Sequence, residues 1–131
     1  MINNKITIGV SVGDINGIGA EVIIKTFDNP TMLELCTPVI FGSSKLISYY
    51  KKLCGSDMPF VGIDDVSQVI QGKVNIVNLW QEAPVITPGR DTEEGGRLAF
   101  SSLKAATEAL KAGDIDALVT APINKKNIQC P

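Results

Sequence analysis

Two short segments hold the side chains whose types and spacing could do chemistry. The first follows an apolar run and reads Gly13-Asp-Ile-Asn-Gly-Ile-Gly19, and the second reads Thr120-Ala-Pro-Ile-Asn-Lys125. In an open α/β sheet, ligands bind beyond the carboxyl ends of the strands, where such turns lie. Glycines would let backbone N–H groups approach an anion at the start of a helix. The candidate residues for contact with a substrate or cofactor are Asp14, Asn16, Gly17, Gly19, Thr120, Asn124 and Lys125.

Both segments also have a purely structural interpretation. The glycine spacing of the first segment matches neither the dinucleotide-binding fingerprint nor the P-loop, and this favours a structural turn. Asp14 and Asn16 could orient a substrate, or they could brace the turn through Asx hydrogen bonds. Lys125 near a helix N-terminus opposes the helix dipole, which suggests pairing with a phosphate or carboxylate. A solvated surface lysine fits the same spacing, so both interpretations of Lys125 stay open.

A third polar segment, residues 88–97, places two arginines near the start of a helix. Arg90 and Arg97 could clamp a carboxylate or phosphate through paired hydrogen bonds. The spacing of Asp91 and Glu94 is that of a capping box, with Asp91 as N-cap and Glu94 at the third helical position. This spacing favours a helix cap over an anion clamp.

Composition excludes several classes of function. The 131 residues contain no histidine, which rules out a Ser-His-Asp triad or a histidine metal site within this chain. The three cysteines form no Cys-x-x-Cys pair, so a zinc knuckle is not expected. The net charge is −2 with no basic block, which argues against nucleic-acid or membrane partners. No signal-peptide pattern is present, and a cytoplasmic location is expected.

The elements that must position these residues alternate along the chain. Apolar runs predict strands at 6–12, 38–41, 60–63, 74–80 and 117–120, and helical patterns cover 20–27, 44–53 and 91–112. In the last helix, Ala99, Leu103, Ala106 and Leu110 form one apolar stripe. The alternation predicts an α/β fold with three α/β/α layers and a mostly parallel sheet. The sequence ends at Pro131, just after a helix expected from residue 124, which is typical of the front part of a longer protein.

These motifs resemble the 4-hydroxythreonine-4-phosphate dehydrogenase family of pyridoxal phosphate biosynthesis. The opening signature of that family is close to Gly-Asp-Pro-Ala-Gly-Ile-Gly-Pro-Glu, which aligns with Gly13 to Glu21 here. Its later signature, Asp-Ala-Leu-Val-Thr-Ala-Pro-Ile-Asn-Lys, is identical to residues 116–125. Ile15, Asn16 and Ala20 replace the usual Pro, Ala and Pro, which suggests a sub-branch of the family. The resemblance covers essentially the whole chain in order.

The resemblance implies an architecture like that of isocitrate and isopropylmalate dehydrogenases, with two α/β/α domains flanking a cleft. It implies a homodimer whose active sites include residues of both subunits. The implied reaction uses NAD and a divalent metal such as Zn, Mg or Co to oxidise 4-phosphohydroxy-L-threonine, a phosphorylated small-molecule substrate. Decarboxylation then gives an aminoketone phosphate.

Members of the family are over twice this length. The resemblance implies that their Gly-His-Thr-Glu segment and three metal-binding histidines lie beyond Pro131, so no metal ligand and no catalytic residue is assigned within this chain. Residues 1–131 are therefore expected to be the N-terminal part of a two-domain dehydrogenase, inactive alone. An exposed apolar face is expected where the second domain or partner subunit docks.

Two alternatives to this expectation remain. One is a non-catalytic ligand-binding or interaction module that retains the front half of the family. The other is an unrelated phosphate-handling α/β enzyme, which would have to work without any histidine from this chain.

Overall fold

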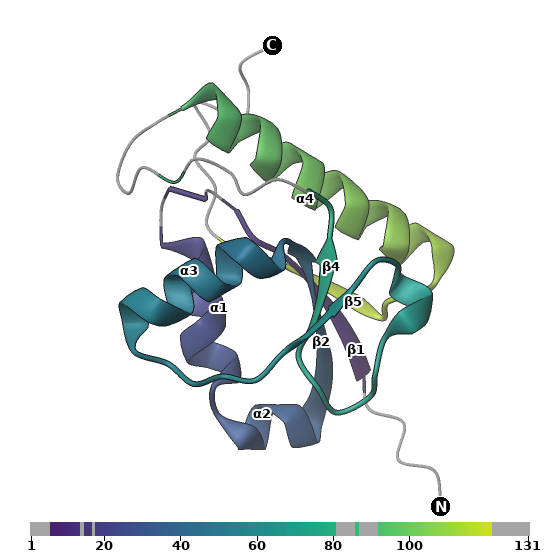
Figure 1. The fold of residues 1–131 in the computed structure, drawn as a ribbon. Coiled ribbons are helices and arrows are strands. Elements are labelled where there is room, and N and C mark those ends of the chain that lie inside the picture. Colours follow the sequence, from purple (N-terminus) through teal and green to yellow (C-terminus); the bar gives the residue numbers. More distant parts are fainter. Residues whose placement is uncertain (1–5, 14, 17, 81–85, 87–91, 122–131) are drawn as a thin grey trace, which may run out of the picture.

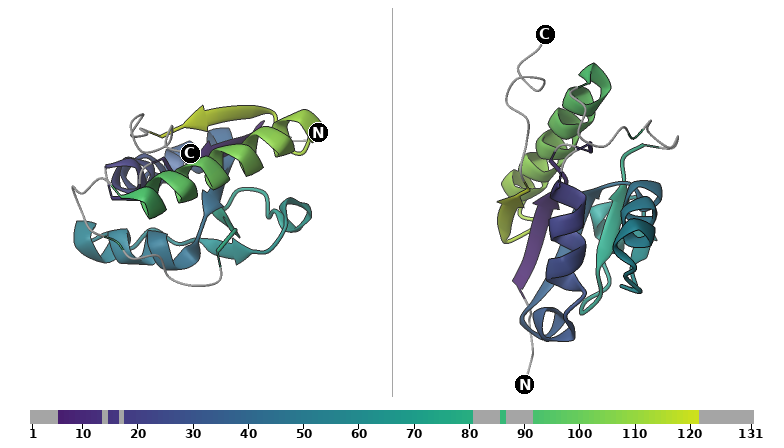
Figure 2. Two further views of the ribbon diagram at one scale, coloured as in Figure 1. Left: turned by 90° about the horizontal axis from the view of Figure 1, so that it is seen from above. Right: turned by 90° about the vertical axis from the view of Figure 1, so that its left-hand side faces the viewer.

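The computed structural model of the chain describes residues 6–13, 15, 16, 18–80, 86 and 92–121. Within these residues, parallel strands form one sheet in the order β3-β4-β2-β1-β5 (Figure 1). The strands are β1 (Ile6–Ser11), β2 (Cys36–Gly42), β3 (Val61–Ile63), β4 (Asn75–Asn78) and β5 (Ala117–Thr120). In the described part of the sheet, β5 lies at the outer edge beside β1 (Figure 2). The parallel α/β fold expected from the sequence is confirmed.

Helices cover both faces of this sheet. They are α1 (Gly19–Phe27), α2 (Pro30–Leu35), α3 (Ser44–Cys54) and α4 (Glu93–Ala112), with a 3₁₀ turn (Val66–Gln68) after β3. Figure 1 shows α1 and α3 together on one side of the strands and α4 on the other. Consecutive residues of β2 point to these two sides, because Ile40 packs in the cluster of α1 and α3 and Val39 in the cluster of α4. The three layers are confirmed.

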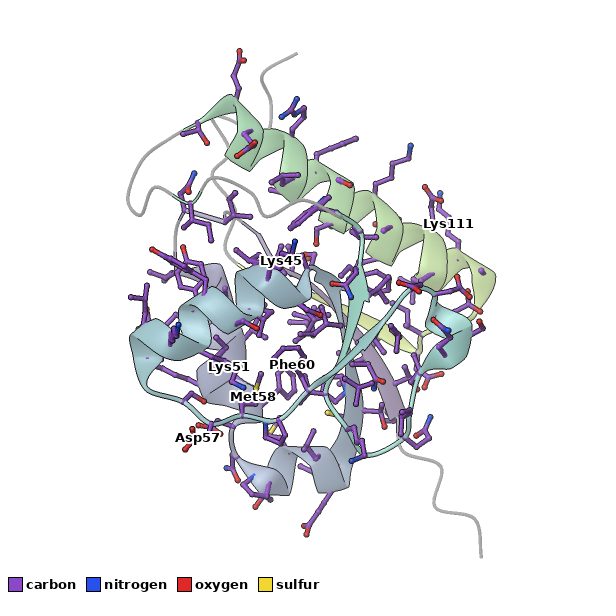
Figure 3. The ribbon with its side chains drawn as sticks, in the orientation of Figure 1. Lys45, Lys51, Asp57, Met58, Phe60 and Lys111 are labelled. Atoms are coloured by element: carbon purple, nitrogen blue, oxygen red, sulfur yellow. The ribbon has the colours of Figure 1, made fainter. Side chains whose placement is uncertain are left out.

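Local sequence accounts for the limits of the helices. Ser43 caps α3, since its side chain accepts a hydrogen bond from the backbone N–H of Leu46, and Gly55 ends the helix with φ 65°. On the same helix, the Lys51 ammonium lies 5.0 Å from the centre of the Phe60 ring, and Phe60 packs against the core cluster of α1 and α3 (Figure 3). No helix in the described part of the chain combines the length and apolarity needed to cross a bilayer.

The expected start of α4 is wrong. The N-cap is Thr92 rather than Asp91, because the Thr92 side chain accepts a hydrogen bond from Gly95 N–H and the helix begins at Glu93. Glu94 therefore occupies the second helical position, so the expected capping box is not the one that forms.

The buried stripe of α4 also differs from the expected one. Ala99 and Ala106 are buried as expected, but Leu103 is half-buried and Leu110 is 39% exposed. The face toward the sheet consists of small residues, namely Gly95, Gly96, Ala99, Ser102, Ala106 and Ala109. Small side chains let the helix axis approach the sheet closely, and the two leucines are displaced to the flank.

The strand expected at 74–80 is shorter in the structure, since β4 spans Asn75–Asn78.

Candidate functional site

The carboxyl ends of four strands meet at one edge of the sheet. Ala121 N–H donates to Ser11 carbonyl oxygen at 3.1 Å, which joins the ends of β5 and β1. Ser44 N–H donates to the Asn78 side chain at 2.7 Å, which joins the start of α3 to the end of β4. Helix α1 begins at this same edge after a turn from β1, and α3 begins there after β2. This is the edge at which parallel α/β sheets bind ligands.

Gly19 is required for the tight packing of α1 against this edge. A Cβ atom at Gly19 would lie 2.3 Å from the carbonyl oxygen of Val12 and 3.4 Å from the Cβ of Ala121. The first distance is shorter than any real contact with backbone, so a larger residue would force the helix or the strand to move. Gly13 turns the chain out of β1 with φ 69°, a conformation that favours glycine.

Helix α3 holds the middle of the turn in place. The Tyr50 hydroxyl donates a buried hydrogen bond to the carbonyl oxygen of Ile15, whose side chain is itself fully buried. Sequence motifs did not identify this contact. A signal was present, because Tyr50 follows Leu46 and Ile47 on the buried face of α3, and a buried tyrosine hydroxyl usually finds a partner.

Asn16 joins the same turn to the start of α4. Its side chain is buried, and its Nδ2 donates to Thr92 Oγ1 at 3.0 Å. Thr92 Oγ1 also accepts from Gly95 N–H at 3.0 Å, so the residue that caps α4 also contacts the turn. Asn16 thus braces the turn against a helix 76 residues further along the chain. Its proposed contact with a ligand stays a prediction.

Ser102 makes a further link that the sequence did not indicate. The Ser102 hydroxyl is fully buried, accepts from Val12 N–H at 3.0 Å and donates to the carbonyl oxygen of Phe41. One side chain of α4 therefore satisfies backbone groups at the ends of both β1 and β2. Groups from α3 and α4 therefore both contact the described residues of the turn after β1.

The structure brings three of the predicted site residues to this edge, namely Asn16, Gly19 and Thr120. Thr120 ends β5 opposite Ser11 of β1, and it is exposed. Arg97 is exposed on α4. The other predicted residues lie outside the described part of the chain, and these are Asp14, Gly17, Arg90, Asn124 and Lys125.

The last ten residues of the chain, 122–131, also lie outside the described residues. The helix expected from residue 124 falls within them and stays a prediction. The expectation that metal-binding histidines follow Pro131 likewise stays a prediction, because Pro131 is the last residue of the sequence.

Two further charged groups lie near the same edge. Lys45 is exposed in the first turn of α3, where a cation opposes the helix dipole (Figure 3). Hydrogen bonds from the side chain and backbone of Ser67 lower the pKa of Asp65, just beyond β3. The Asp65 carboxylate caps the 3₁₀ turn, and this local role accounts for its position.

The described residues do not fit a metal site. Among them, no group of three or more His, Cys, Asp or Glu side chains is placed to hold an ion. The chain contains no histidine in any of its 131 positions. Thr120 is exposed and could hydrogen-bond a polar ligand, but the described part of the chain offers no metal-ligand set to accompany it.

Comparisons with known proteins are consistent with one another. Residues 34–130 match the family model described as pyridoxal phosphate biosynthetic protein PdxA. The chain is 43% identical to 4-hydroxythreonine-4-phosphate dehydrogenase of Bacteroides thetaiotaomicron, over 98% of this chain and 35% of that protein. It is 30% identical to a Clostridium botulinum protein provisionally described as D-threonate 4-phosphate dehydrogenase, over 98% of this chain and 40% of that one.

A solved structure shares the fold. The crystal structure of a 4-hydroxythreonine-4-phosphate dehydrogenase from Burkholderia phymatum superposes with a TM-score of 0.88 at 30% identity. The match covers 96% of this chain and 39% of that one. The chain thus spans well under half the length of each of these relatives.

Proposed function

The chain belongs to the family of the pyridoxal phosphate biosynthetic protein PdxA, and we propose from that premise that it supplies the N-terminal part of a dehydrogenase. The proposed whole enzyme depends on NAD and a divalent metal and oxidises the secondary alcohol of 4-phosphohydroxy-L-threonine. The resulting β-keto acid loses carbon dioxide to give an aminoketone phosphate. The observation that carries the proposal is the 43% identity to the Bacteroides thetaiotaomicron dehydrogenase across nearly the whole of this chain.

In this proposal, the chain contributes one wall of the substrate and cofactor cleft. Thr120 is exposed, and its hydroxyl can donate to or accept from a polar group of the substrate. The turn that contains Asn16 lies at the same edge, and its anchoring by Tyr50 and Ser102 would keep it preorganised. We assign Asp14, Gly17, Asn124 and Lys125 to the same wall from their position in the two motifs.

The metal ligands of the proposed enzyme lie outside this chain, in polypeptide that would follow Pro131. We derive no step through a metal or NAD, since the described residues form no ligand set for an ion and the turn lacks the dinucleotide-binding glycine pattern. We propose that the chain alone is inactive and that the complete protein is a cytoplasmic homodimer.

The experiment compares the 131-residue chain with a chimera in which it replaces the matching part of the Bacteroides thetaiotaomicron enzyme. NADH formation is measured with 4-phosphohydroxy-L-threonine and, separately, with D-threonate 4-phosphate, in the presence of Zn, Mg or Co. We expect no turnover by the chain alone and metal-dependent turnover of the first substrate by the chimera. Turnover by the chain alone would contradict the proposal. A chimera that folds but shows no turnover, while the Bacteroides enzyme is active, would also contradict it. If that chimera still binds the substrate, the non-catalytic alternative is favoured.

A matched pair of variants tests the contribution of Thr120 in that chimera. Thr120→Val keeps the shape of the side chain but removes its hydroxyl, and we expect kcat/KM to fall by about tenfold or more, because a hydrogen bond to substrate is lost. Thr120→Ser should restore most of the activity. Thr107→Val on α4 serves as the control, because the Thr107 hydroxyl donates to the carbonyl oxygen of Leu103 within its own helix. Equal activity of Thr120→Val and the unsubstituted chimera would remove Thr120 from the site.

A further inference from the structure

In the described part of the chain, two buried side-chain atoms have no hydrogen-bond partner. They are the hydroxyl oxygen of Ser11 and the indole nitrogen of Trp80. Ser11 is the last residue of β1, and Trp80 follows closely after the carboxyl end of β4. Buried polar groups are nearly always paired in folded proteins, so each exception calls for an explanation. Both exceptions lie at the carboxyl edge of the sheet, where ligands bind in folds of this class.

The Ser11 side chain is fully buried and faces α4. Val10 packs in the cluster of α1 and α3, so the next residue, Ser11, points to the opposite face of the sheet. The carbonyl oxygen of Ser11 already accepts a hydrogen bond from Ala121 N–H. The carbonyl oxygen of Phe41, on the neighbouring strand, already accepts from the Ser102 hydroxyl. These nearby backbone acceptors therefore do not account for the Ser11 hydroxyl.

Thr120 is the neighbour of Ser11 across the sheet. The two residues are partners in the parallel pairing of β1 with β5, and paired strands lie about 4.8 Å apart. Leu118 packs in the cluster of α4, so Thr120, two residues further on, lies on the same face as Ser11. Helix α4 packs against both strands (Figure 2). Because Ser11 is fully buried and Thr120 is exposed, the pair connects the interior to the surface at the carboxyl edge.

We propose that Ser11 is a positioning residue whose hydroxyl donates to the Thr120 hydroxyl oxygen when an anionic ligand binds at Thr120. The Thr120 O–H then donates to a carboxylate or phosphate oxygen of the ligand. The Ser11 hydroxyl is not bonded to Thr120 in this structure, so the bond forms as the Thr120 side chain turns toward the ligand. The inference rests on the proposed function, which places Thr120 in the substrate wall.

Ligand binding would give the buried hydroxyl its partner. An unpaired buried hydroxyl costs free energy in the ligand-free protein, and this cost is removed when the bond forms. An exposed side chain changes rotamer rapidly, and the ligand oxygen supplies the acceptor that holds Thr120 in one orientation. Hydrogen bonds in a chain polarise one another, which strengthens the outer bond to the charged oxygen. Ser11 therefore contributes to ligand affinity and not to the stability of the ligand-free fold.

The stability of the ligand-free chain gives the first test. Ser11→Ala removes an unpaired hydroxyl, so we expect the urea midpoint to stay the same or to rise. Ser102→Ala is the matched comparison, because Ser102 is also fully buried between the sheet and α4 but its hydroxyl both accepts and donates a hydrogen bond. If Ser11→Ala lowers the midpoint as much as Ser102→Ala does, the hydroxyl has a partner in the folded chain and the proposal is overturned.

Ligand binding gives the second test, in the chimera with the remainder of the Bacteroides enzyme. Calorimetry measures the affinity for 4-phosphohydroxy-L-threonine with Zn present and NAD absent, so turnover is not needed. We expect Ser11→Ala to weaken binding about three- to tenfold, because one hydrogen bond is lost. In a Thr120→Val background, Ser11→Ala should have no further effect, because Ser11 acts only through the Thr120 hydroxyl.

Two further ligands identify the anionic group. Inorganic phosphate and 4-hydroxy-L-threonine, which lacks the phosphate, are titrated into the same chimera. Weaker binding of phosphate in Ser11→Ala would assign the phosphate group to Thr120, and weaker binding of 4-hydroxy-L-threonine would assign the carboxylate.

The pairing of the two substitutions separates this inference from the proposed reaction. An equal loss of affinity from Ser11→Ala with and without Thr120→Val would overturn the inference, even in a chimera that turns over its substrate. A chimera that binds none of the three compounds would overturn it as well. A chimera without turnover that still shows the coupling between Ser11 and Thr120 would contradict the proposed reaction alone.

Discussion

At the scale of single residues, the turn after β1 is held by side chains that come from distant parts of the chain. Tyr50 is the clearest case, because its hydroxyl is the donor to a carbonyl oxygen inside the turn. We expect Tyr50→Phe to lower the free energy of unfolding by about 1 kcal/mol, since the ring packing is kept and one buried hydrogen bond is lost. Urea denaturation measures the change. Tyr49→Phe is the control, because Tyr49 is 38% exposed, and an equal loss in both variants would contradict the assigned role.

Gly19 permits a close approach that no other residue allows. We expect Gly19→Ala to cost about 1–3 kcal/mol, because a Cβ 2.3 Å from the Val12 carbonyl oxygen must displace the start of α1. Gly55→Ala is a useful comparison, since nothing lies within 4 Å of a Cβ there and its cost comes from φ 65° alone. Chemical shifts measured by NMR should change around Val12 and Ala121 in the first variant only. Unchanged shifts there would show that the helix accommodates the methyl group.

At the scale of elements, α4 is fastened to the sheet by one serine as well as by its small residues. Ser102→Ala leaves the Val12 N–H and the Phe41 carbonyl without this partner, and we expect a loss of about 1–3 kcal/mol in the free energy of unfolding. Ser101→Ala, one position away and half-buried, is the control and should change stability by less than about 0.5 kcal/mol. If Ser102→Ala leaves the free energy of unfolding unchanged, water must replace the hydroxyl. Thermal denaturation of both variants measures the change.

Elements were more predictable than the contacts between them. Apolar runs such as Ile6–Ser11 predict strands because a buried parallel strand needs apolar side chains on both faces. The sequence places the start of α4 one residue too early, since Asp91 and Thr92 are both good N-caps and only the observed hydrogen bond from Gly95 N–H to Thr92 distinguishes them. The contact between Asn16 and Thr92 was not predictable, because it depends on how α4 returns to the turn after 76 residues. Local sequence patterns contain no information of that kind.

At the scale of the whole molecule, β2 couples the two helical layers, because neighbouring residues of this strand pack on opposite faces. Ile40 lies in the cluster of α1 and α3, Val39 lies in the cluster of α4, and both are fully buried. We expect Ile40→Ala to cost about 2–5 kcal/mol, and Val39→Ala somewhat less, through cavities in the core. If the sheet unfolds as one cooperative unit, either substitution should accelerate hydrogen exchange in α1 and in α4 by the same factor.

Unequal acceleration of hydrogen exchange in α1 and α4 would contradict this expectation. Faster exchange confined to α4 in Val39→Ala, or to α1 in Ile40→Ala, would mean that the two layers open separately. That result would make the layer of α4 a local unit, and the bonds from Ser102 and Thr92 to the sheet and turn would then be its main attachments near the site. Equal acceleration would mean that the carboxyl edge has the stability of the whole sheet. The site could then lose its geometry only when the sheet itself unfolds.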